Sequence, residues 1–298
     1  MELVNARVLA EGLAFPEGPV ALSDGSVILV EIKAGRLTRV SADGKKTVVC
    51  ETGGGPNGAA IGPDGGLYVC NNGGFPRSAT PAIQRVDIDT GRCETLYAEC
   101  AGEPLAGPND LVFDETGHFW FTDFRGDAIY YAAPDGSRIE RMIKDCSGPN
   151  GVGLSPDGRT LYWAQTYTRQ LLRRRLSEPG KLTPSLGHSL MAVLSHGSLD
   201  TDVLVVGLPG ARELDSLAVD ASGAVCVGSL IEGGITVFDP ENRSETLWTL
   251  PPPLADRAVT NICFGGPDLR TAYLTCSETG RLVACDWPRP GLKLRYSR

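Results

Sequence analysis

The chain has 298 residues, of which 42% are hydrophobic and 21% charged, and it carries a formal net charge of −8 with a pI of about 5.0. This acidic balance argues against a nucleic-acid surface, because phosphate binding relies on clustered Lys and Arg. No apolar run approaches the roughly 20 residues that a membrane span requires, and the amino terminus lacks the basic and apolar segments of a signal peptide. We therefore predict a cytoplasmic protein, a monomer or small homo-oligomer, that acts on a small molecule and binds neither nucleic acid nor membranes.

Two compositional features point to structure rather than to chemistry. The run Arg173-Arg174-Arg175 lies within a strand-like segment, for which a solvated outer strand is the favoured interpretation. The nine cysteines show no C-x-x-C spacing and their number is odd, so neither a disulfide framework nor a zinc site is indicated. Cys70, Cys226 and Cys276 each fall in or beside an apolar strand, where a small buried thiol packs well. We expect inert core thiols, which suit a reducing compartment.

One pattern recurs along the chain: a polar residue, an apolar strand, an Asp-Gly-like turn and a second strand. The clearest copy runs from Gly148-Pro149-Asn150 through Pro156-Asp157-Gly158 to Tyr162-Trp163. Close copies begin at Gly55-Pro56-Asn57 and Gly107-Pro108-Asn109, and three others are looser. The leading polar residues, in chain order, are Glu17, Asn57, Asn109, Asn150, Asp215 and Asn261. Their intervals of 40, 52, 41, 65 and 46 residues indicate a six-fold repeat.

Each repeat contains two clear strands followed by two weaker ones. In the second repeat the strands after the first are expected over residues 67–70, 82–87 and 92–97. Short strands bounded by turns, at a period of about 40 to 50 residues, are the signature of a β-propeller. The sequence therefore predicts an all-β fold, a six-bladed β-propeller with four-stranded antiparallel blades, as a single domain over residues 1–298.

Two segments lie outside this pattern. The run Val4 to Leu9 precedes the first repeat, and we expect it to supply a strand to the last blade and so join the two ends of the ring. The segment Leu186 to Leu194 is compatible with a short helical turn or with another strand, and the sequence does not decide between them.

The six leading residues are candidates for a metal site. The first strand of each propeller blade lines the central channel, so equivalent residues converge on one axis. Shaping of a local turn explains Asn57 and Asn261 equally well. It does not explain Glu17, and a position that accepts Glu, Asn and Asp indicates selection for a side-chain oxygen. Oxygen ligands without Cys or His suit calcium, magnesium or manganese, with positions left open for water or substrate.

The loops after the second strands are expected beside this site, because the second strand returns to the end at which the first begins. Arg125 and Tyr167 are the preferred substrate contacts, since a guanidinium and a phenol can hydrogen-bond sugar hydroxyls or a carboxylate. Asn72, in the equivalent loop of the second repeat, is a further candidate. For each of them a loop side chain that faces water is an equally good explanation. The loops contain Lys33, Asn71-Asn72, Asp123 to Arg125, Gln165 to Tyr167, Glu232 and Ser277-Glu278.

Other catalytic schemes find no support in the sequence. There is no G-x-S-x-G motif, and the histidines, His118, His188 and His196, do not occupy channel positions, so a Ser-His-Asp hydrolase is not indicated. Neither a P-loop nor a G-x-G-x-x-G motif before a helix is present, so a nucleotide cofactor is not expected.

Several motifs resemble those of the senescence marker protein/gluconolactonase/luciferin-regenerating enzyme family, over the whole chain. The matching segments are Phe15-Pro16-Glu17-Gly18-Pro19, Pro108-Asn109-Asp110, Gly148-Pro149-Asn150-Gly151 and Leu214 to Asp220. The resemblance implies a six-bladed propeller that holds one divalent metal ion in its channel and hydrolyses sugar-acid lactones. Calcium is expected first, and magnesium, manganese, zinc or iron are compatible with it.

By this resemblance Glu17, Asn150 and Asp215 would be metal ligands, and Asn109 a fourth ligand or a substrate contact. Asp215 is also the implied catalytic residue, and because a metal-bound carboxylate is a poor base, we expect it to activate water jointly with the ion. Sugar lactonases of the family carry an Arg two residues before the Asn109 position, where this chain has Gly107. This departure puts the usual sugar-lactone substrate in doubt and makes Arg125 a possible substitute.

Three functions are compatible with such a site. In the first, a lactone hydrolase, the metal polarises the ring carbonyl, water attacks, and the ring opens to a hydroxy acid. The second is an organophosphate or phosphoester hydrolase, since the same ion would serve a phosphoryl oxygen. The third is a non-catalytic ligand-binding propeller with a structural ion, which a closed metal shell and a capped channel mouth would support.

Overall fold

The computed structural model describes residues 1–184 and 203–298, in which the regular structure is almost entirely β-strand. Its strands form antiparallel units of four that we number 1 to 6 in chain order. Unit 1 contains β2 (Pro16–Ala21), β3 (Val27–Glu31), β4 (Arg36–Val40) and β5 (Lys46–Glu51). Unit 2 contains β6 (Pro56–Ile61), β7 (Leu67–Asn71), β8 (Ala82–Val86) and β9 (Cys93–Tyr97). Unit 3 contains β12 (Pro108–Phe113), β13 (Phe119–Asp123), β14 (Ala128–Ala132) and β15 (Ile139–Ile143).

The remaining units depart slightly from this scheme. Unit 4 contains β16 (Pro149–Leu154), β17 (Thr160–Gln165), β18 (Gln170–Glu178) and β20 (Leu204–Gly207), with the short β19 (Lys181–Leu182) also on β18. Unit 5 contains β21 (Glu213–Val219), β22 (Val225–Leu230), β23 (Ile235–Asp239) and β24 (Ser244–Trp248). Unit 6 contains β25 (Ala258–Gly265), β26 (Thr271–Cys276), β27 (Arg281–Asp286) and β1 (Val4–Ala10). A two-stranded ribbon, β10 (Glu99–Cys100) and β11 (Glu103–Pro104), and a 3-10 turn, η1 (Pro252–Leu254), lie between units.

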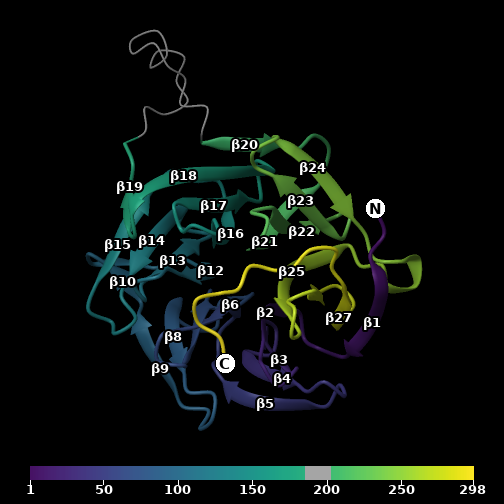
Figure 1. Ribbon diagram of the computed structural model, residues 1–298. Coiled ribbons are helices and arrows are strands. Elements are labelled where there is room, and N and C mark those ends of the chain that lie inside the picture. The colour runs from purple at the N-terminus through teal and green to yellow at the C-terminus, as the bar shows by residue number, and fades with distance from the viewer. Residues whose placement is uncertain (185–202) are drawn as a thin grey trace.

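The units are arranged around a centre, with their first strands innermost and their last strands at the rim (Figure 1). Each first strand contacts the first strands of both neighbouring units, from β2 through β6, β12, β16, β21 and β25 and back to β2. Units 5 and 6 are also joined by a short β22 to β25 pairing, which makes them one eight-stranded sheet. The prediction of an all-β fold built from four-stranded antiparallel units is thus confirmed.

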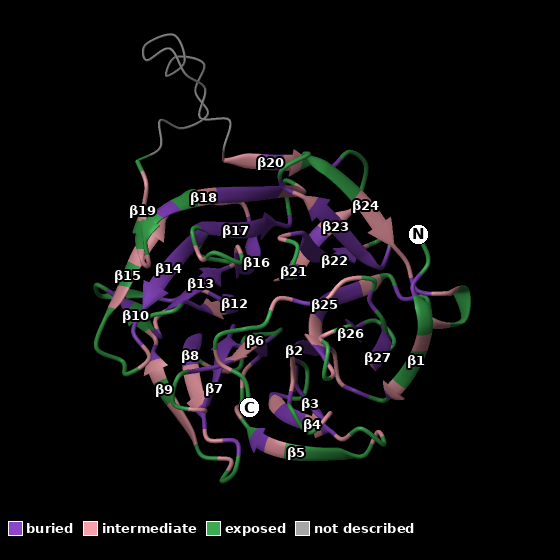
Figure 2. Ribbon diagram, in the orientation of Figure 1, coloured by how far each residue is buried: buried purple, intermediate pink, exposed green. Residues whose placement is uncertain are grey.

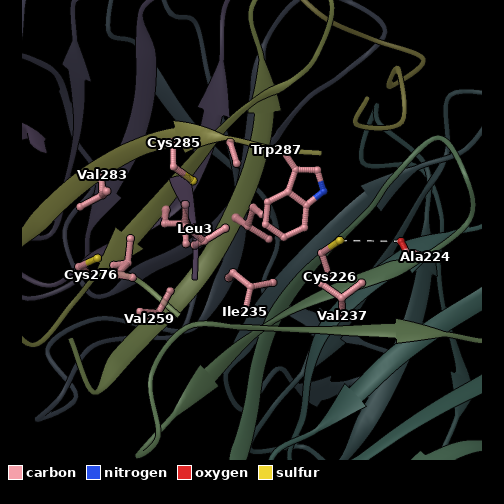
Figure 3. Packing of buried hydrophobic residues seen from close by; sticks show 14 residues of the cluster. Leu3, Ala224, Cys226, Ile235, Val237, Val259, Cys276, Val283, Cys285 and Trp287 are labelled. Carbon is pink, nitrogen blue, oxygen red and sulfur yellow. Dashed lines mark hydrogen bonds between the residues drawn. The ribbon is translucent and has the colours of Figure 1, made fainter. Parts of the chain in front are cut away.

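The amino-terminal strand completes the last unit, as the sequence predicts. β1 pairs antiparallel with β27, and Leu3 lies in the hydrophobic cluster between units 5 and 6. Figure 3 shows Leu3 beside Trp287, with Cys226, Cys276 and Cys285 in the same cluster. All nine cysteines are free, which agrees with the expectation of inert core thiols.

The core lies between neighbouring units, because each sheet is covered on both faces. The second strands are buried along their whole length in four units and at all but one residue in the other two, which explains their continuous apolar sequence. Figure 2 shows this buried inner zone and the more exposed outer strands. The arginine run lies in a strand, β18, as expected, but the prediction of solvated side chains is wrong for Arg173. It is only 7% exposed and its guanidinium lies 3.5 Å from Pro240 O in unit 5, whereas Arg174 is half-buried and Arg175 is exposed.

The carboxyl-terminal tail, residues 287–298, crosses the end of the ring at which the Asp-Gly turns lie (Figure 1). Leu292 N donates to Val219 O at the end of β21, and the Tyr296 ring packs edge-on against Phe113 at the end of β12, with centroids 5.8 Å apart. The tail therefore covers the end of the inner strands opposite the leading polar residues. No helix in the described part of the chain is long and apolar enough to cross a membrane, and the undecided segment 186–194 lies outside the described residues.

Candidate active site

The strand register brings the leading polar residues and the second-strand loops to the same end of the ring. In units 2, 3 and 4 the proline before each Asn pairs with the last residue of the second strand, as Pro56 does with Asn71 and Pro149 with Gln165. In unit 1, Glu17 pairs with Val30 near the end of β3. The expected position of the loops beside the candidate site is therefore confirmed.

Each first strand carries a β-bulge at its leading polar residue. In units 1 to 5, two residues of the first strand at or directly after the leading residue oppose one residue of the second, and in unit 6 the extra residue is Thr260. A bulge re-aims side chains and often accompanies a functional site. In three units the residue after the leading polar residue is a glycine, namely Gly18, Gly58 or Gly151. A larger side chain would not fit, since a Cβ atom at Gly151 would lie 2.4 Å from Leu217 N.

Glu17 is a buried carboxylate at the centre of this arrangement. It is 2% exposed, and its Oε2 accepts hydrogen bonds from Gly18 N at 2.7 Å and from Asn261 Nδ2 at 2.8 Å. Burial raises its pKa above the usual value, although these hydrogen bonds oppose the rise. Such a carboxylate is costly to keep charged without a cation nearby.

Asp215 shares this environment. Burial raises the pKa of Asp215 well above its ordinary value, the neighbouring Glu17 charge raises it further, and a hydrogen bond from Asn150 opposes the rise. The structure thus places Glu17, Asn150 and Asp215 in one group of interacting side chains. Glu17 is buried and Asp215 half-buried, and repulsion between two such carboxylates is the situation that a divalent cation relieves.

The amide side chains divide into two kinds. Asn57 and Asn109 each place a buried Oδ1 atom that has no hydrogen-bond partner among the described residues. Asn261 differs, because its Oδ1 accepts Ile262 N at 2.7 Å while its Nδ2 holds Glu17. Asn261 therefore orients Glu17, and its own oxygen is already used. Asn57, which the sequence left between turn residue and ligand, keeps an available oxygen.

Asp110 is a third acid in this group, buried like Glu17, and the sequence analysis did not single it out. It is 6% exposed and accepts Leu111 N at 2.9 Å. Burial, followed by the Glu17 charge, raises its pKa to about 8. The repeat could have drawn attention to Asp110. The equivalent position is a glycine in three other units, Gly18, Gly58 and Gly151, so an acidic residue there departs from the pattern.

These residues fit a divalent metal ion. The carboxylates of the buried Glu17 and the half-buried Asp215, which repel each other, and the partnerless Oδ1 of Asn109 form a set of hard oxygen donors. Among the described residues, no three His, Cys, Asp or Glu side chains lie together as a metal site by themselves. A metal here would therefore depend on the amide oxygens of Asn109 and Asn150 as well as on Glu17 and Asp215.

Arg125 lies over Gly107, two residues before Asn109. A Cβ atom at Gly107 would come within 3.2 Å of Cγ and Cδ of Arg125. The guanidinium stacks on the Phe75 ring, 4.2 Å from its centroid, and donates to Asn72 O at 3.3 Å. Arg125 thus occupies the space beside Gly107, as expected of a substitute for a missing side chain there.

Tyr167 takes the corresponding place in unit 4. A Cβ atom at Gly148, two residues before Asn150, would lie 2.7 Å from the Tyr167 ring and 3.2 Å from the Phe124 ring. The two rings pack together with centroids 5.3 Å apart, yet Tyr167 remains 61% exposed. An open aromatic face therefore stands beside the start of β16.

Asn72 is less available than the other predicted substrate contacts. It is 3% exposed, and its Oδ1 accepts Gly74 N at 2.9 Å within its own loop. Its contact with a substrate stays a prediction.

Polar side chains at the ends of second strands hold the backbone that leads into the first strands. The sequence analysis did not predict this structural role, because it considered these loops only as substrate contacts. The hydrogen bonds are Ala14 N to Glu31 Oε2 at 2.7 Å, Gly55 N to Asn71 Oδ1 at 2.9 Å, Gly107 N to Asp123 Oδ1 at 2.7 Å and Ser147 N to Gln165 Oε1 at 3.0 Å. Each fixes a segment two or three residues before a leading residue.

A cavity of about 630 Å³ lies elsewhere on the molecule. Its lining includes Asp157, Gly223 and Glu241, which belong to turns at the opposite end of units 4 and 5. It contains none of the leading polar residues, so we do not assign the chemistry to it.

Comparison with known proteins agrees with this geometry. The chain is 29% identical over 241 residues to "Lactonase drp35" of Staphylococcus haemolyticus, covering 78% of this chain and 68% of that protein. The structure of a gluconolactonase from Xanthomonas campestris superposes with a TM-score of 0.75 at 24% identity, covering 96% of this chain and 91% of that one. Regucalcin from Agrobacterium tumefaciens, described as a calcium-binding protein, gives a TM-score of 0.71 at 19% identity over 97% of both chains.

A family model extends over most of the chain. The model for the "SMP-30/Gluconolactonase/LRE-like region" matches residues 15–278, which include every leading polar residue from Glu17 to Asn261. The chain therefore belongs to the SMP-30/gluconolactonase/LRE-like family.

Proposed function

We propose that this chain is a single-domain, six-bladed β-propeller that hydrolyses small lactones with the help of one divalent metal ion. Its family membership and its similarity to a protein named as a lactonase support the reaction class. The observation that carries the proposal is the pair of mutually repelling carboxylates, the buried Glu17 and the half-buried Asp215, beside the partnerless amide oxygen of Asn109.

The proposed ligands are Glu17, Asn109, Asn150 and Asp215, with Asn57 as a further oxygen in reach of the same axis. Carboxylate and amide oxygens are hard donors, so calcium is proposed first, followed by magnesium and manganese. Zinc and iron fit less well, because no His or Cys side chain is part of the set. Similarity to a structure described as a calcium-binding protein supports this order.

When bound, a divalent ion supplies Lewis-acid polarisation of the lactone carbonyl and lowers the pKa of water. Asp215 would orient the attacking water and accept its proton, because its carboxylate lies beside Asn150 and Glu17. The water oxygen bonds to the carbonyl carbon, the ring C–O bond breaks, and the leaving alkoxide takes a proton. The product is a hydroxy acid.

Arg125 and Tyr167 would position the substrate on the side of units 3 and 4. The Arg125 guanidinium is stacked on Phe75, so it is held in place before any substrate arrives. The exposed Tyr167 ring offers a flat apolar surface next to the start of β16. Together they favour a lactone that combines an apolar ring face with a polar substituent over a fully hydroxylated sugar lactone.

Metal analysis followed by assays on lactone and phosphotriester panels tests the proposal. We expect lactone turnover that is lost with EDTA, restored by Ca²⁺, and abolished in Asp215→Ala and Asn109→Ala. Asp157→Asn, in the turn at the opposite end of unit 4, is the matched control and should keep full activity. Lactone turnover that survives both metal removal and Asp215→Ala would overturn the proposal, and turnover of phosphotriesters alone would favour the organophosphate alternative.

A further inference from the structure

Three buried hydroxyl groups connect neighbouring units at the candidate metal site. Each comes from the end of one unit's second strand and donates to a main-chain carbonyl in the next unit's first strand. The hydrogen bonds are Thr122 Oγ1 to Asn150 O at 2.6 Å, Thr166 Oγ1 to Leu214 O at 2.7 Å and Ser277 Oγ to Pro16 O at 2.6 Å. The acceptors belong to Asn150 itself and to the residues immediately before Asp215 and Glu17. The three hydrogen bonds therefore fix the backbone at, or directly before, three of the four proposed ligands.

Burial makes these hydrogen bonds difficult to replace. Thr122 is 0% exposed, Thr166 5% and Ser277 4%. If one hydroxyl were removed, the carbonyl oxygen that accepts from it would lose that donor at a buried position. Its bulged strand would then be free to shift relative to the neighbouring unit.

The direction of the Thr166 hydrogen bond determines how Asn150 is oriented. A carbonyl can only accept, so the single Thr166 proton is committed to Leu214 O. Thr166 Oγ1 can then only accept from Asn150, whose Nδ2 lies 3.2 Å away. The Asn150 amide nitrogen is thereby turned toward Thr166 and its Oδ1 toward the opposite side, where Ser216 Oγ lies at 3.4 Å.

The other two hydroxyls are bound on both sides in the same way. Thr122 Oγ1 accepts a hydrogen bond from Asp110 N at 3.1 Å and donates one to the next unit. Ser277 Oγ lies 2.7 Å from Thr260 Oγ1 in its own unit. Each hydroxyl thus joins the first strand of its own unit to that of the following unit.

We propose that Thr122, Thr166 and Ser277 are positioning residues of the metal site, which hold Asn150, Asp215 and Glu17 in ligand geometry without touching the ion. The inference rests on the proposed metal function. It predicts that the hydroxyls determine metal affinity beyond any contribution to folding, because they fix the relative positions of ligands from different units.

Calcium titration calorimetry on the full chain tests this role. In Thr166→Val, Thr122→Val and Ser277→Ala we expect the Ca²⁺ dissociation constant to rise about 10-fold or more, the usual cost of removing a group that orients a ligand. Thr166→Ser retains the hydroxyl and should restore wild-type affinity. Thr236→Val is the matched control: Thr236 is also fully buried, but its hydroxyl bonds within unit 5, to Ser229 Oγ at 2.7 Å on the adjacent strand, and not to a main-chain carbonyl of the next unit.

Thermal unfolding in EDTA, measured on the same variants, separates positioning from folding. Unchanged Ca²⁺ affinity in Thr166→Val and Ser277→Ala, with a loss of stability like that of Thr236→Val, would overturn the inference. Ser277→Ala removes a single oxygen atom, so it keeps the test available if the valine variants fail to fold. Absence of Ca²⁺ and Mn²⁺ binding in the wild type would instead refute the metal function on which the inference rests.

Discussion

The side-chain amide of Asn261 donates a hydrogen bond to Glu17 Oε2 at 2.8 Å, which joins the first strands of units 6 and 1. The two residues are 244 positions apart in sequence. Because the Asn261 oxygen is held by Ile262 N, its nitrogen is directed at Glu17. The last repeat thus orients the carboxylate that the first repeat supplies.

Replacing Asn261 by leucine should weaken metal binding. The change removes the donor that fixes Glu17, and a lost hydrogen bond to a charged group is worth about 1.5 to 3 kcal/mol, or roughly 10- to 100-fold in affinity. Calorimetric titration with Ca²⁺ measures it. Asn242→Leu is the control, because Asn242 also donates to a carboxylate, Asp239, but in an exposed turn. Equal Ca²⁺ affinity in both variants would contradict the role assigned to Asn261.

The metal-free protein should lose stability as the pH rises. The pKa values of Glu17, Asp110 and Asp215 are raised in the folded chain, and that of Asp110 reaches about 8 from a usual 3.8. Between these values the folded state binds more protons than the unfolded state, so the free energy of unfolding falls with increasing pH. In EDTA we expect the melting temperature to decline from pH 5 to pH 8.

Added Ca²⁺ should reverse this trend, because a cation stabilises the charged carboxylates and competes with their protons. The increase in melting temperature on adding Ca²⁺ should therefore be larger at pH 8 than at pH 5. Asp110→Asn, which cannot ionise, should flatten the pH dependence in EDTA. A melting temperature in EDTA that rises steadily toward pH 8 would argue against three acids with raised pKa values in one group.

Much of this arrangement could be predicted from the sequence, and the part that could not has a physical reason. The repeat revealed Glu17 and Asp215 because identical positions in a repeat converge in space. It could not assign Asn57 and Asn261, because an amide side chain looks the same in sequence whichever of its atoms faces the channel. The use of Thr166 was also hidden, since its acceptor, Leu214 O, is a backbone atom 48 residues away in another unit.

Gly18→Ala should be far more destabilising than Gly158→Ala, although both glycines have positive φ angles, +48° and +67°. A Cβ atom at Gly18 would lie 2.3 Å from Asn57 O, whereas nothing lies within 4 Å at Gly158. Backbone strain costs about 1 kcal/mol in both, and overpacking adds about 1 to 3 kcal/mol at Gly18 alone. Urea denaturation measures the difference. Equal losses would mean that the first strands of units 1 and 2 are not in close contact.

Arg125 and Gly107 offer the sharpest test of substrate binding. Arg125→Ala should raise KM for lactones with a polar substituent by about 10-fold, because a charged hydrogen-bond donor is removed, and should leave Ca²⁺ affinity unchanged. Gly107→Arg alone should conflict with the Arg125 stem, whose Cγ and Cδ lie 3.2 Å from the new Cβ position. In Gly107→Arg/Arg125→Ala the new arginine can occupy the space that the Arg125 side chain fills in the wild type. The KM should therefore recover in part relative to Arg125→Ala, and the substrate preference should shift toward hydroxylated sugar lactones. Steady-state kinetics on matched polar and apolar lactones decides the point: identical KM values for both classes in all three variants would show that neither position contacts the substrate.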